Sequence, residues 1–349
     1  MTPLKIAVVG PGLMGKKHIE LLANNPDCQL AALVAPDHVP HHKLANQLGV
    51  SLFHSVEDMI ASESLDGIII ASPNIFHAEQ AIACINAGIP VLIEKPISHT
   101  FQSAKKIVDL TIKIEAKVLI GHHRAHSPIL MAARKTIQND ELGKIVVIMG
   151  SSLFYKPHEY FLAGPWRQEP GGGPILINLI HEIGIFRSLC GEIVAVQAIA
   201  SSSTRKFAVE DTVVINFQFA SGALGTFVLS DTAASARSWE QTSQENKSYP
   251  SYGDEDCYHV AGTKGSLSIP SMRIKQYKND EERSWWKPFT EKMISIARQD
   301  PLECQLTHFI QVIKGTAQPL VSAQDGLRNL QITEAVSDSA RSQKMVQIA

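Results

Sequence analysis

Two short segments of the chain combine residue types that are able to bind a charged ligand and move a proton. Gly10, Gly12 and Gly15 form a GxGxxG run that directly follows an apolar segment and enters a helical pattern. Glycines at this spacing permit a tight turn and let backbone N–H groups approach a pyrophosphate. Lys95, inside a Glu-Lys-Pro run, carries an ammonium directly after a later apolar segment, where a strand is expected to end. Together the two segments predict a nicotinamide-dependent oxidoreductase.

Alternating strands and helices are expected to position both segments. Short apolar runs predict strands over residues 5–9, 30–34, 67–71, 90–94 and 117–121. Amphipathic stretches predict helices between them, over residues 16–24, 42–48, 77–87 and 102–115. Near-continuous apolar strands that alternate with helices are typical of a doubly wound parallel sheet. Residues 1–123 are therefore expected to form a dinucleotide-binding Rossmann domain.

Residues 124–349 have a different pattern, which predicts an α+β domain with a large, open and mainly antiparallel sheet. Apolar alternation within 213–219 directs one set of side chains to a core, and the turn at 220–222 predicts an antiparallel hairpin. We expect helices to cover one sheet face and the other face to join subunits in a homodimer or homotetramer. The remaining expected elements are strands over 144–154, 193–202, 211–219 and 223–231, helices over 128–139 and 175–189, and a polar loop over 238–256.

Composition and charge exclude several classes of partner. The formal net charge is −2 and no block of five or more Lys or Arg occurs, so we expect no binding to nucleic acid or to an anionic membrane. No apolar run approaches the roughly 20 residues needed to span a bilayer. The five cysteines are scattered without CxxC spacing, as expected where thiols stay reduced. A strand begins too early to leave room for a signal peptide, so a cytoplasmic location is expected.

The preference for one nicotinamide cofactor depends on the residues that come directly after the second predicted strand. A carboxylate is expected there, roughly 20 residues after the glycines, to hold the ribose 2′-hydroxyl of NAD. The chain has Ala35, Pro36 and Asp37 at this point. Asp37 would favour NAD if it reaches the ribose, whereas Ala35 would leave space for the 2′-phosphate of NADP beside His38, His41 or Lys43. No arginine is near, so NAD is favoured and NADP stays open.

An ordered set of motifs along the chain resembles the Gfo/Idh/MocA oxidoreductases. The set comprises the opening glycine run, Ser72-Pro73-Asn74 with His77, Glu94-Lys95-Pro96, the GHHR run that ends at Arg124, Pro165-Trp166-Arg167, and a glycine triplet that leads to His181. The resemblance covers nearly the whole chain. It implies a Rossmann domain that binds NAD or NADP and a second domain with the substrate pocket and, in many members, the oligomer contact. Members typically oxidise a hydroxyl of a sugar, polyol or cyclic diol, or run the reverse reduction.

The same resemblance implies roles for Lys95 and His181. Lys95 is similar to the family lysine that binds the reacting oxygen, and His181 resembles the general acid/base that takes the hydroxyl proton. Many members carry an aspartate four residues before this histidine, where the present chain has Ile177. Asn178 would share the helical face of His181 and replace that aspartate as a hydrogen-bond partner, but without its charge. Lys95 would then bear more of the proton transfer.

The other candidate residues are expected to contact the cofactor or the substrate. Tyr155, Lys156, His158 and Tyr160, with Arg237 and Trp239, would form a cationic pocket for a hydroxylated substrate that carries a carboxylate. The expected cofactor contacts are Gly10, Gly12, Leu13, Met14, Gly15, Asp37, Ser72, Pro73, Asn74, His77, Glu94, Lys95, Arg124, Trp166 and Arg167. The expected substrate contacts are Lys95, His123, Tyr155, Tyr160, Asn178, His181, Arg237 and Trp239.

Two groups of histidines raise the question of a metal site. They are His38, His41 and His42, and His122, His123 and His126. Neither group has a Cys or Glu at ligand spacing, so no metal site is predicted.

Two other functions are compatible with the same motifs. Relatives of the fold include glycosidases that use NAD for transient oxidation and non-enzymatic regulators that sense nucleotides. Because a regulator has no need of both Lys95 and His181, their joint presence favours an enzyme.

Overall fold

The computed structural model describes residues 2–348, which fall into two compact units. Unit 1 comprises the chain up to His126 together with Pro301–Leu330, and unit 2 comprises Ser127–Asp300 and the chain from Gln331. The predicted domains, 1–123 and 124–349, differ from this division because the segment 301–330 packs with the first unit. Leu306, Phe309 and Ile310 of that segment belong to the core of unit 1. Such a return of the chain leaves no trace in local periodicity.

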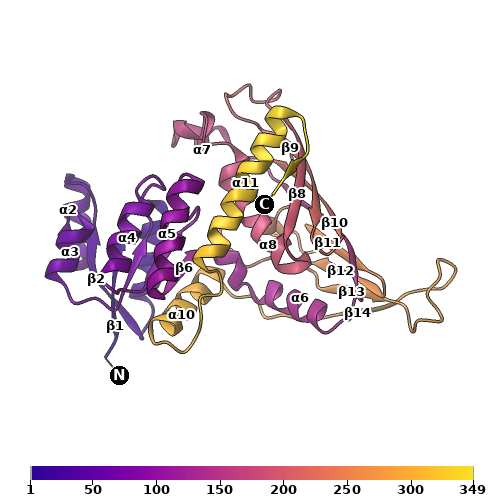
Figure 1. The fold of residues 1–349 in the computed structure, drawn as a ribbon, viewed down its shortest axis with the longest axis horizontal. Coiled ribbons are helices and arrows are strands. Elements are labelled where there is room, and N and C mark those ends of the chain that lie inside the picture. The colour runs from indigo at the N-terminus through magenta and orange to yellow at the C-terminus, as the bar shows by residue number, and fades with distance from the viewer. Residues whose placement is uncertain (1, 349) are drawn as a thin grey trace. The chain divides into compact units, whose positions relative to one another are not determined.

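A six-stranded parallel sheet forms the centre of unit 1, as predicted, with the strand order β3-β2-β1-β4-β5-β6 (Figure 1). The strands are β1 (Leu4–Val9), β2 (Cys28–Val34), β3 (Ser51–Phe53), β4 (Gly67–Ile70), β5 (Val91–Glu94) and β6 (Val118–Gly121). The helices are α1 (Leu13–Ala23), α2 (Val39–Leu48), α3 (Val56–Ser62), α4 (His77–Asn86), α5 (Phe101–Ile114), the 3-10 turn η1 (His123–His126) and α10 (Pro301–Ile313). The strand order reverses between β1 and β4, which is where doubly wound sheets bind ligands.

Unit 2 contains a nine-stranded sheet with the order β14-β13-β12-β11-β7-β10-β9-β8-β15. Its strands are β7 (Ile145–Leu153), β8 (Ile193–Ser201), β9 (Thr212–Phe219), β10 (Leu224–Ser230), β11 (Tyr258–Gly262), β12 (Gly265–Ile269), β13 (Arg273–Gln276), β14 (Thr290–Met293) and β15 (Val346–Gln347). Only β7 and β10 pair in parallel among these neighbours. The mainly antiparallel sheet and the hairpin between β9 and β10 are therefore confirmed.

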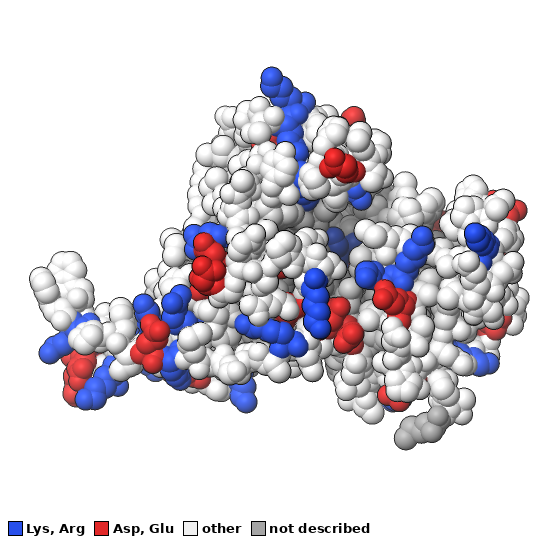
Figure 2. Space-filling model, turned by 180° about the vertical axis from the view of Figure 1, so that it is seen from behind, with Lys and Arg blue, Asp and Glu red and all other residues white. Residues whose placement is uncertain are grey.

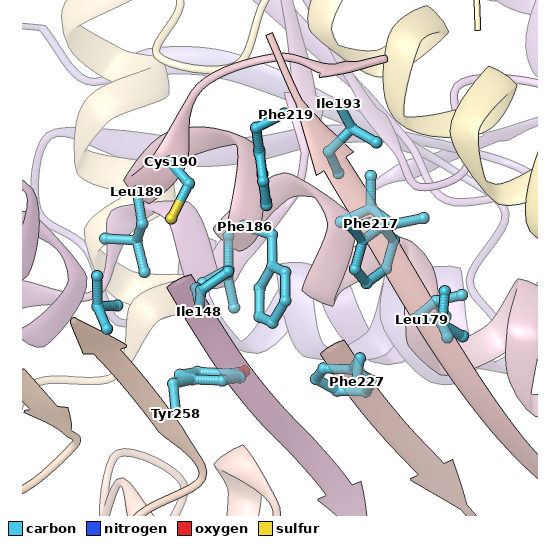
Figure 3. Close-up of a cluster of buried hydrophobic side chains, with 14 of the residues drawn as sticks. Ile148, Leu179, Phe186, Leu189, Cys190, Ile193, Phe217, Phe219, Phe227 and Tyr258 are labelled. Atoms are coloured by element: carbon cyan, nitrogen blue, oxygen red, sulfur yellow. The ribbon is translucent and has the colours of Figure 1, made fainter. Parts of the chain in front are cut away.

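Helices cover the inner face of this sheet. Phe186 of α8 (Ile180–Cys190) lies 5.5 Å, between ring centroids, from both Phe217 and Phe227, and 6.1 Å from Tyr258 (Figure 3). Aromatic rings at these distances add to the free energy of burial. The other helical segments that begin in unit 2 are α6 (Pro128–Gln138), α7 (His158–Leu162), η2 (Pro165–Gln168), η3 (Ile175–Leu179) and α9 (Trp239–Thr242), and α11 (Ala323–Ser342) begins in unit 1 and ends in unit 2.

The outer face of the same sheet keeps several large apolar side chains in contact with solvent. Their exposed fractions are 51% for Val146, 74% for Ile199, 43% for Val214 and 55% for Leu224. Val214 alternates along β9 with the fully buried Val213 and Ile215, as the sequence pattern predicts. A sheet face of this kind is a candidate contact surface.

Charged side chains of both signs are interspersed over the face drawn in Figure 2. This distribution agrees with the near-neutral net charge and shows no large field of one sign on that face. Within residues 2–348, no helix combines the length and apolarity that crossing a membrane requires. The cytoplasmic location stays a prediction.

Candidate active site

The glycine turn after β1 is closed on two sides by the protein and open on a third. Gly10 has φ +83°, and a Cβ there would lie 2.5 Å from the Ser72 Cα. A Cβ on Gly15 would lie 2.1 Å from the Gly10 carbonyl oxygen. A Cβ on Gly12 would meet no protein atom within 4 Å. Gly10 and Gly15 are therefore required by packing, whereas Gly12 leaves room for another molecule to approach the backbone.

The helix that starts at this turn presents an uncapped N-terminus. Gly12 is the N-cap residue of α1, no side chain caps it, and no acidic residue occupies the first turn. Leu13 is 77% exposed, so the entrance to the helix faces solvent. N–H groups and the positive end of the helix dipole therefore converge on the open position at Gly12, beside the β1/β4 switch point. These features fit the pyrophosphate of a dinucleotide, which would rest against Gly12 and the first turn of α1.

The loop after β4 borders the glycine turn through Ser72. The Ser72 hydroxyl donates a hydrogen bond to Gln80 Oε1 at 2.6 Å. The ring of His77 is 1% exposed, with Nδ1 2.9 Å from the Pro96 carbonyl oxygen and Nε2 2.8 Å from that of Ser72. Burial lowers the pKa of His77, although both carbonyl contacts oppose that shift. The expected cofactor contact of His77 is corrected here, because its ring points inward and joins two loops.

Residues between Ser72 and His77 keep the positions expected of a loop at a ligand site. Pro73 is exposed and Asn74 is half-buried, so both remain candidates for contact with the cofactor.

Glu94 is turned into the interior of unit 1 and is not available to a ligand. It is 4% exposed, and His18 of α1 donates a hydrogen bond from Nε2 to Glu94 Oε1 at 2.8 Å. The other carboxylate oxygen accepts the Lys95 N–H at 3.3 Å. The expected cofactor contact of Glu94 is therefore corrected: its carboxylate is used within the protein.

His18 was not foreseen as part of the site. It shares the buried face of α1 with Gly15, Ile19 and Leu22. A histidine on a buried helical face needs a buried partner, and this position was the only signal that the sequence offered.

Lys95 begins the loop after β5, next to the loop after β6. The two strands are parallel neighbours, with Glu94 paired to Gly121. His123, two residues past β6, has a pKa well below its usual value because partial burial disfavours its charged form and because Arg124 and Lys95 are positive. Arg124, in η1, is 3% exposed. Lys95 and His123, both expected substrate contacts, therefore lie on neighbouring loops of unit 1.

Unit 2 holds a buried charged cluster around Lys156. Lys156 is 6% exposed. Its ammonium donates a hydrogen bond to Asn178 Oδ1 at 2.7 Å and lies 3.9 Å from Asp231 Oδ2. Arg205 donates from Nε to Asp231 Oδ1 at 2.6 Å and from Nη2 to the Lys156 carbonyl oxygen at 2.8 Å. Burial raises the pKa of Asp231, and the charges of Lys156 and Arg205 oppose the rise. Two cations thus share one carboxylate in this cluster.

The contact with Lys156 sets the orientation of Asn178. An ammonium only donates, so the amide oxygen of Asn178 faces Lys156 and the Nδ2 hydrogens face elsewhere. Asn178 lies in η3, which is a π-helical turn, and His181 lies in the first turn of α8. The predicted α-helix over 175–189 is therefore wrong in its first turn, and the α-helical spacing that would place Asn178 on the face of His181 does not hold there.

The glycine triplet packs against Trp166 and Glu210. A Cβ on Gly172 would lie 2.1 Å from the Trp166 carbonyl oxygen, and one on Gly173 would lie 2.4 Å from Glu210 Oε1. Glu210 also accepts the Ile175 N–H at 2.8 Å, and burial raises its pKa. The triplet therefore allows η2 and the start of η3 to approach closely.

Aromatic and cationic side chains meet beside this triplet. The Arg167 guanidinium lies 3.9 Å from the Tyr160 ring centroid, and the Lys156 ammonium lies 4.9 Å from the same centroid. Burial raises the pKa of Tyr160, with Arg167 opposing. Trp166 and Tyr155 are 56% and 61% exposed. The predicted Tyr160 and Arg167 are thus brought together with Lys156 and, through it, with Asn178.

Two predicted substrate contacts lie elsewhere in unit 2. Trp239 is 3% exposed and stacks on Tyr258, with ring centroids 5.7 Å apart, so its apolar indole is part of the core. Arg237 pairs with Glu255 at 3.2 Å and lines a cavity of about 640 Å³ with outward-facing residues of β7 and β11 such as Met149 and His259. The assignment of Trp239 to the substrate pocket is therefore corrected, whereas that of Arg237 stays a prediction.

Comparisons with known proteins agree with this architecture over most of the chain. A model of an oxidoreductase family with an NAD-binding Rossmann fold matches residues 4–122, and the model of its C-terminal alpha/beta domain matches residues 134–348. The chain belongs to the Gfo/Idh/MocA family. This Gfo/Idh/MocA protein is an oxidoreductase that acts on CH–OH groups with a nicotinamide cofactor.

Relatives of this Gfo/Idh/MocA protein include the rhizopine catabolism protein MocA of Rhizobium meliloti, 26% identical over 342 residues, which are 97% of this chain and 95% of the relative. The inositol 2-dehydrogenase of Rhizobium meliloti is 22% identical, with 99% of each chain covered. The solved structure of the WlbA dehydrogenase from Bordetella pertussis, in complex with NADH and UDP-GlcNAcA, has a TM-score of 0.78 and 20% identity, with 100% of this chain and 99% of that chain covered. At this identity the solved structure supports the fold alone.

Substitution of single glycines separates packing from ligand binding in this Gfo/Idh/MocA protein. Gly12→Ala should change the Tm by no more than about 3 °C, because the new methyl group meets no protein atom. It should weaken NADH binding by about tenfold or more, since the methyl group occupies the approach to the helix N-terminus. Gly15→Ala should cost about 3 kcal/mol through its overlap with the Gly10 carbonyl. Differential scanning fluorimetry and NADH fluorescence titration measure both effects, and wild-type NADH affinity in Gly12→Ala would contradict the assignment.

Proposed function

We propose that the protein is an NAD-preferring dehydrogenase or reductase that transfers hydride between nicotinamide C4 and a secondary alcohol of a sugar, sugar acid, polyol or cyclic diol. The observation that carries this proposal is the open backbone at Gly12, which lies at an uncapped helix N-terminus in the same unit as Lys95. When bound, the cofactor supplies the acceptor or donor of the hydride. The side chains of the protein bind the alcohol and move its proton.

Lys95 and His181 have separate roles toward the alcohol group of the substrate. The Lys95 ammonium donates a hydrogen bond to the alcohol oxygen and stabilises its developing negative charge. The imidazole of His181 accepts the hydroxyl proton during oxidation and returns it during reduction. His123 assists Lys95 by staying neutral, because a partly buried imidazole without charge does not repel the ammonium.

Asn178 acts as an amide donor in place of the usual aspartate. Its oxygen is engaged by Lys156, so only its Nδ2 hydrogens are available to the substrate or to His181. Because the chain lacks the negative charge of that aspartate, His181 is a weaker base than in the aspartate-bearing members, and Lys95 carries more of the proton transfer.

A substrate that carries a carboxylate suits the charges of this region. Lys156 and Arg205 share the single carboxylate of Asp231, and Arg167 adds a third cation stacked on Tyr160. These cations are able to bind an anionic group on a hydroxylated substrate, against the charges of Glu210 and Asp211, which lie in the same region. Tyr155 and Trp166, both more than half exposed, supply apolar surface and hydrogen-bond donors for a sugar-like ring.

The activity assay with a substrate panel tests the reaction and the catalytic residues together. Nicotinamide absorbance should change with at least one compound among aldonates, polyols and dihydrodiols, and most rapidly with one that bears a carboxylate. Lys95→Ala and His181→Ala should each lower kcat by about 10²-fold or more, the range expected for loss of an acid/base or oxyanion partner, while NADH affinity changes little.

The matched controls are surface residues of the same types. Lys105→Ala removes an exposed lysine paired with Asp109 on α5, and His99→Ala removes an exposed histidine. Both should keep wild-type kcat. Near wild-type turnover in Lys95→Ala or His181→Ala would refute the assignment of that residue, and turnover of neutral polyols alone would refute the carboxylate preference.

Asp37 selects NAD by accepting hydrogen bonds from the adenosine ribose. Asp37 follows β2, and the glycine turn is joined to the end of β2 by the Gly10 N–H, which donates to the Val34 carbonyl at 2.8 Å. A hydrogen bond from His42, and after it the charge of His54, lower the pKa of Asp37, so the carboxylate is anionic and repels a 2′-phosphate.

The wild-type protein should bind NADH more tightly than NADPH by about tenfold or more. Asp37→Ser should reduce that ratio toward one, because it removes the ribose acceptor and the repulsion together. Fluorescence titration with both dinucleotides measures the ratio. A wild-type preference for NADPH would contradict the role of Asp37.

The outer face of the sheet in unit 2 joins subunits into a homodimer or homotetramer. Its exposed apolar side chains, among them Ile199 and Leu224, are the type of surface that oligomers bury. Light scattering should give the mass of two or four chains, and the mass of one chain would contradict this proposal.

A further inference from the structure

Three potential metal ligands from separate elements meet at one edge of the sheet in unit 1. Asp37 follows β2, His42 lies in α2, and His54 follows β3. β2 and β3 are parallel neighbours with Val34 paired to Phe53, so residues after both strands emerge at the same edge. One ligand atom of each residue lies within 4.8 Å of the other two. This group is distinct from the histidine groups that the sequence suggested, because His54 is brought in only by the fold.

A backbone carbonyl orients the ring of His54 and determines which of its nitrogens is able to bind a metal. Its Nδ1 lies 3.2 Å from the Ala35 carbonyl oxygen. A carbonyl only accepts hydrogen bonds, so Nδ1 carries the hydrogen and, in the neutral ring, Nε2 carries the lone pair. Histidines that bind metals are commonly oriented in this way, with the second nitrogen donating to a carbonyl or carboxylate.

His42 and Asp37 provide the other two donors. His42 Nε2 lies 2.7 Å from Asp37 Oδ1, and the rings of His42 and His54 are 6.0 Å apart between centroids. The side chains of Asp37 and His42 are 76% and 50% exposed. Both are therefore able to rotate, and the loss of solvation on binding an ion is small.

We propose that Asp37, His42 and His54 form a binding site for one late divalent transition-metal ion, with Zn²⁺ as the reference ion. Two imidazoles and one carboxylate suit Zn²⁺, Co²⁺ or Ni²⁺, whereas Mg²⁺ and Ca²⁺ prefer a shell made of oxygen atoms. Ligands of tetrahedral zinc are about 3.4 Å apart, so atoms already within 4.8 Å need only side-chain rotation to reach that spacing. Three protein ligands leave one position for water.

The proposed ion would compete with the cofactor. This consequence rests on the proposed function, in which Asp37 binds the adenosine ribose. A carboxylate oxygen bound to a metal no longer accepts the ribose hydroxyl, so ion and cofactor exclude each other at Asp37. The site would therefore make cofactor binding sensitive to free transition metal.

Metal binding is measured first, without cofactor or substrate. The full-length protein, treated with a chelator and dialysed, is titrated with ZnCl₂ by calorimetry and with CoCl₂ by visible absorption. We expect one ion per chain at this site, with the cobalt spectrum of nitrogen and oxygen ligands. His42→Gln and His54→Gln should each weaken Zn²⁺ binding by about tenfold or more, the effect expected from loss of one ligand.

His41→Gln is the matched control. His41 is a neighbouring histidine whose Nδ1 lies 2.8 Å from the Pro36 carbonyl oxygen, and it is not one of the three clustered ligands. It should keep wild-type Zn²⁺ affinity. No stoichiometric binding in the wild type, or equal affinity in wild type, His42→Gln and His54→Gln, would overturn the proposal. MgCl₂ should give no signal, and a Mg²⁺ affinity equal to that of Zn²⁺ would overturn the choice of metal.

Competition with NADH separates this proposal from the proposed function. Zn²⁺ should raise the apparent Kd of NADH in the wild type and in His41→Gln, and much less in His54→Gln. Stoichiometric Zn²⁺ binding without an effect on NADH would support the metal site and refute the ribose role of Asp37. NADH binding without Zn²⁺ binding would refute the metal site alone.

NADPH binding that strengthens at low pH and is lost in His42→Gln and His54→Gln, without Zn²⁺ binding, would reassign the histidines to a 2′-phosphate.

Discussion

The buried hydrogen bond between His18 and Glu94 joins the helix of the glycine turn to the Glu-Lys-Pro run in unit 1. His18 belongs to the helix that starts at the glycine turn, and Glu94 directly precedes Lys95. Both side chains are almost fully buried, so removal of either would leave the other without its partner at a cost of several kcal/mol. The second Glu94 oxygen accepts the Lys95 N–H, and a Cβ on Gly121 would lie 3.0 Å from the Glu94 carboxyl carbon. The Glu94 carboxylate thus adds to the pairing of β5 with β6 a link between the start of the Lys95 loop and α1.

A second buried carboxylate, that of Asp231, positions charged side chains in unit 2. Asp231 binds Arg205 and lies close to Lys156, and Lys156 in turn orients the amide of Asn178. One carboxylate thus positions the ammonium that fixes the amide of Asn178. Because burial raises the pKa of Asp231 while both cations oppose that rise, the ionised carboxylate and its two cations depend on one another.

The sequence was most informative where the local backbone or packing permits only one type of residue. The GxGxxG run predicted a turn whose packing requires Gly10 and Gly15, and strand periodicity predicted both sheets. Residue type alone did not reveal direction: His77, Glu94 and Trp239 face the interior, although their types suit a ligand. Partners distant in the chain, such as Arg205 with Asp231, and the return of residues 301–330 to unit 1, depend on tertiary packing that local patterns do not encode. The π-helical turn before His181 likewise has no counterpart in the apolar pattern.

Asp37 differs from these buried groups because its state is set by the molecule or ion that binds it. With 76% of its side chain exposed, it has little desolvation cost with either ribose or metal as partner, and neither partner is excluded by packing. Occupancy therefore follows mass action, the ratio of each free ligand to its own Kd. The His42 hydrogen bond is the element that couples the two outcomes. While His42 donates this hydrogen bond, the Asp37 carboxylate is oriented for a ribose. When a metal ion takes the lone pair of His42, the hydrogen bond is lost and both residues bind the ion instead. In the proposed roles, the edge of the sheet at which Asp37 would hold the ribose is also the edge at which a transition-metal ion would oppose the cofactor.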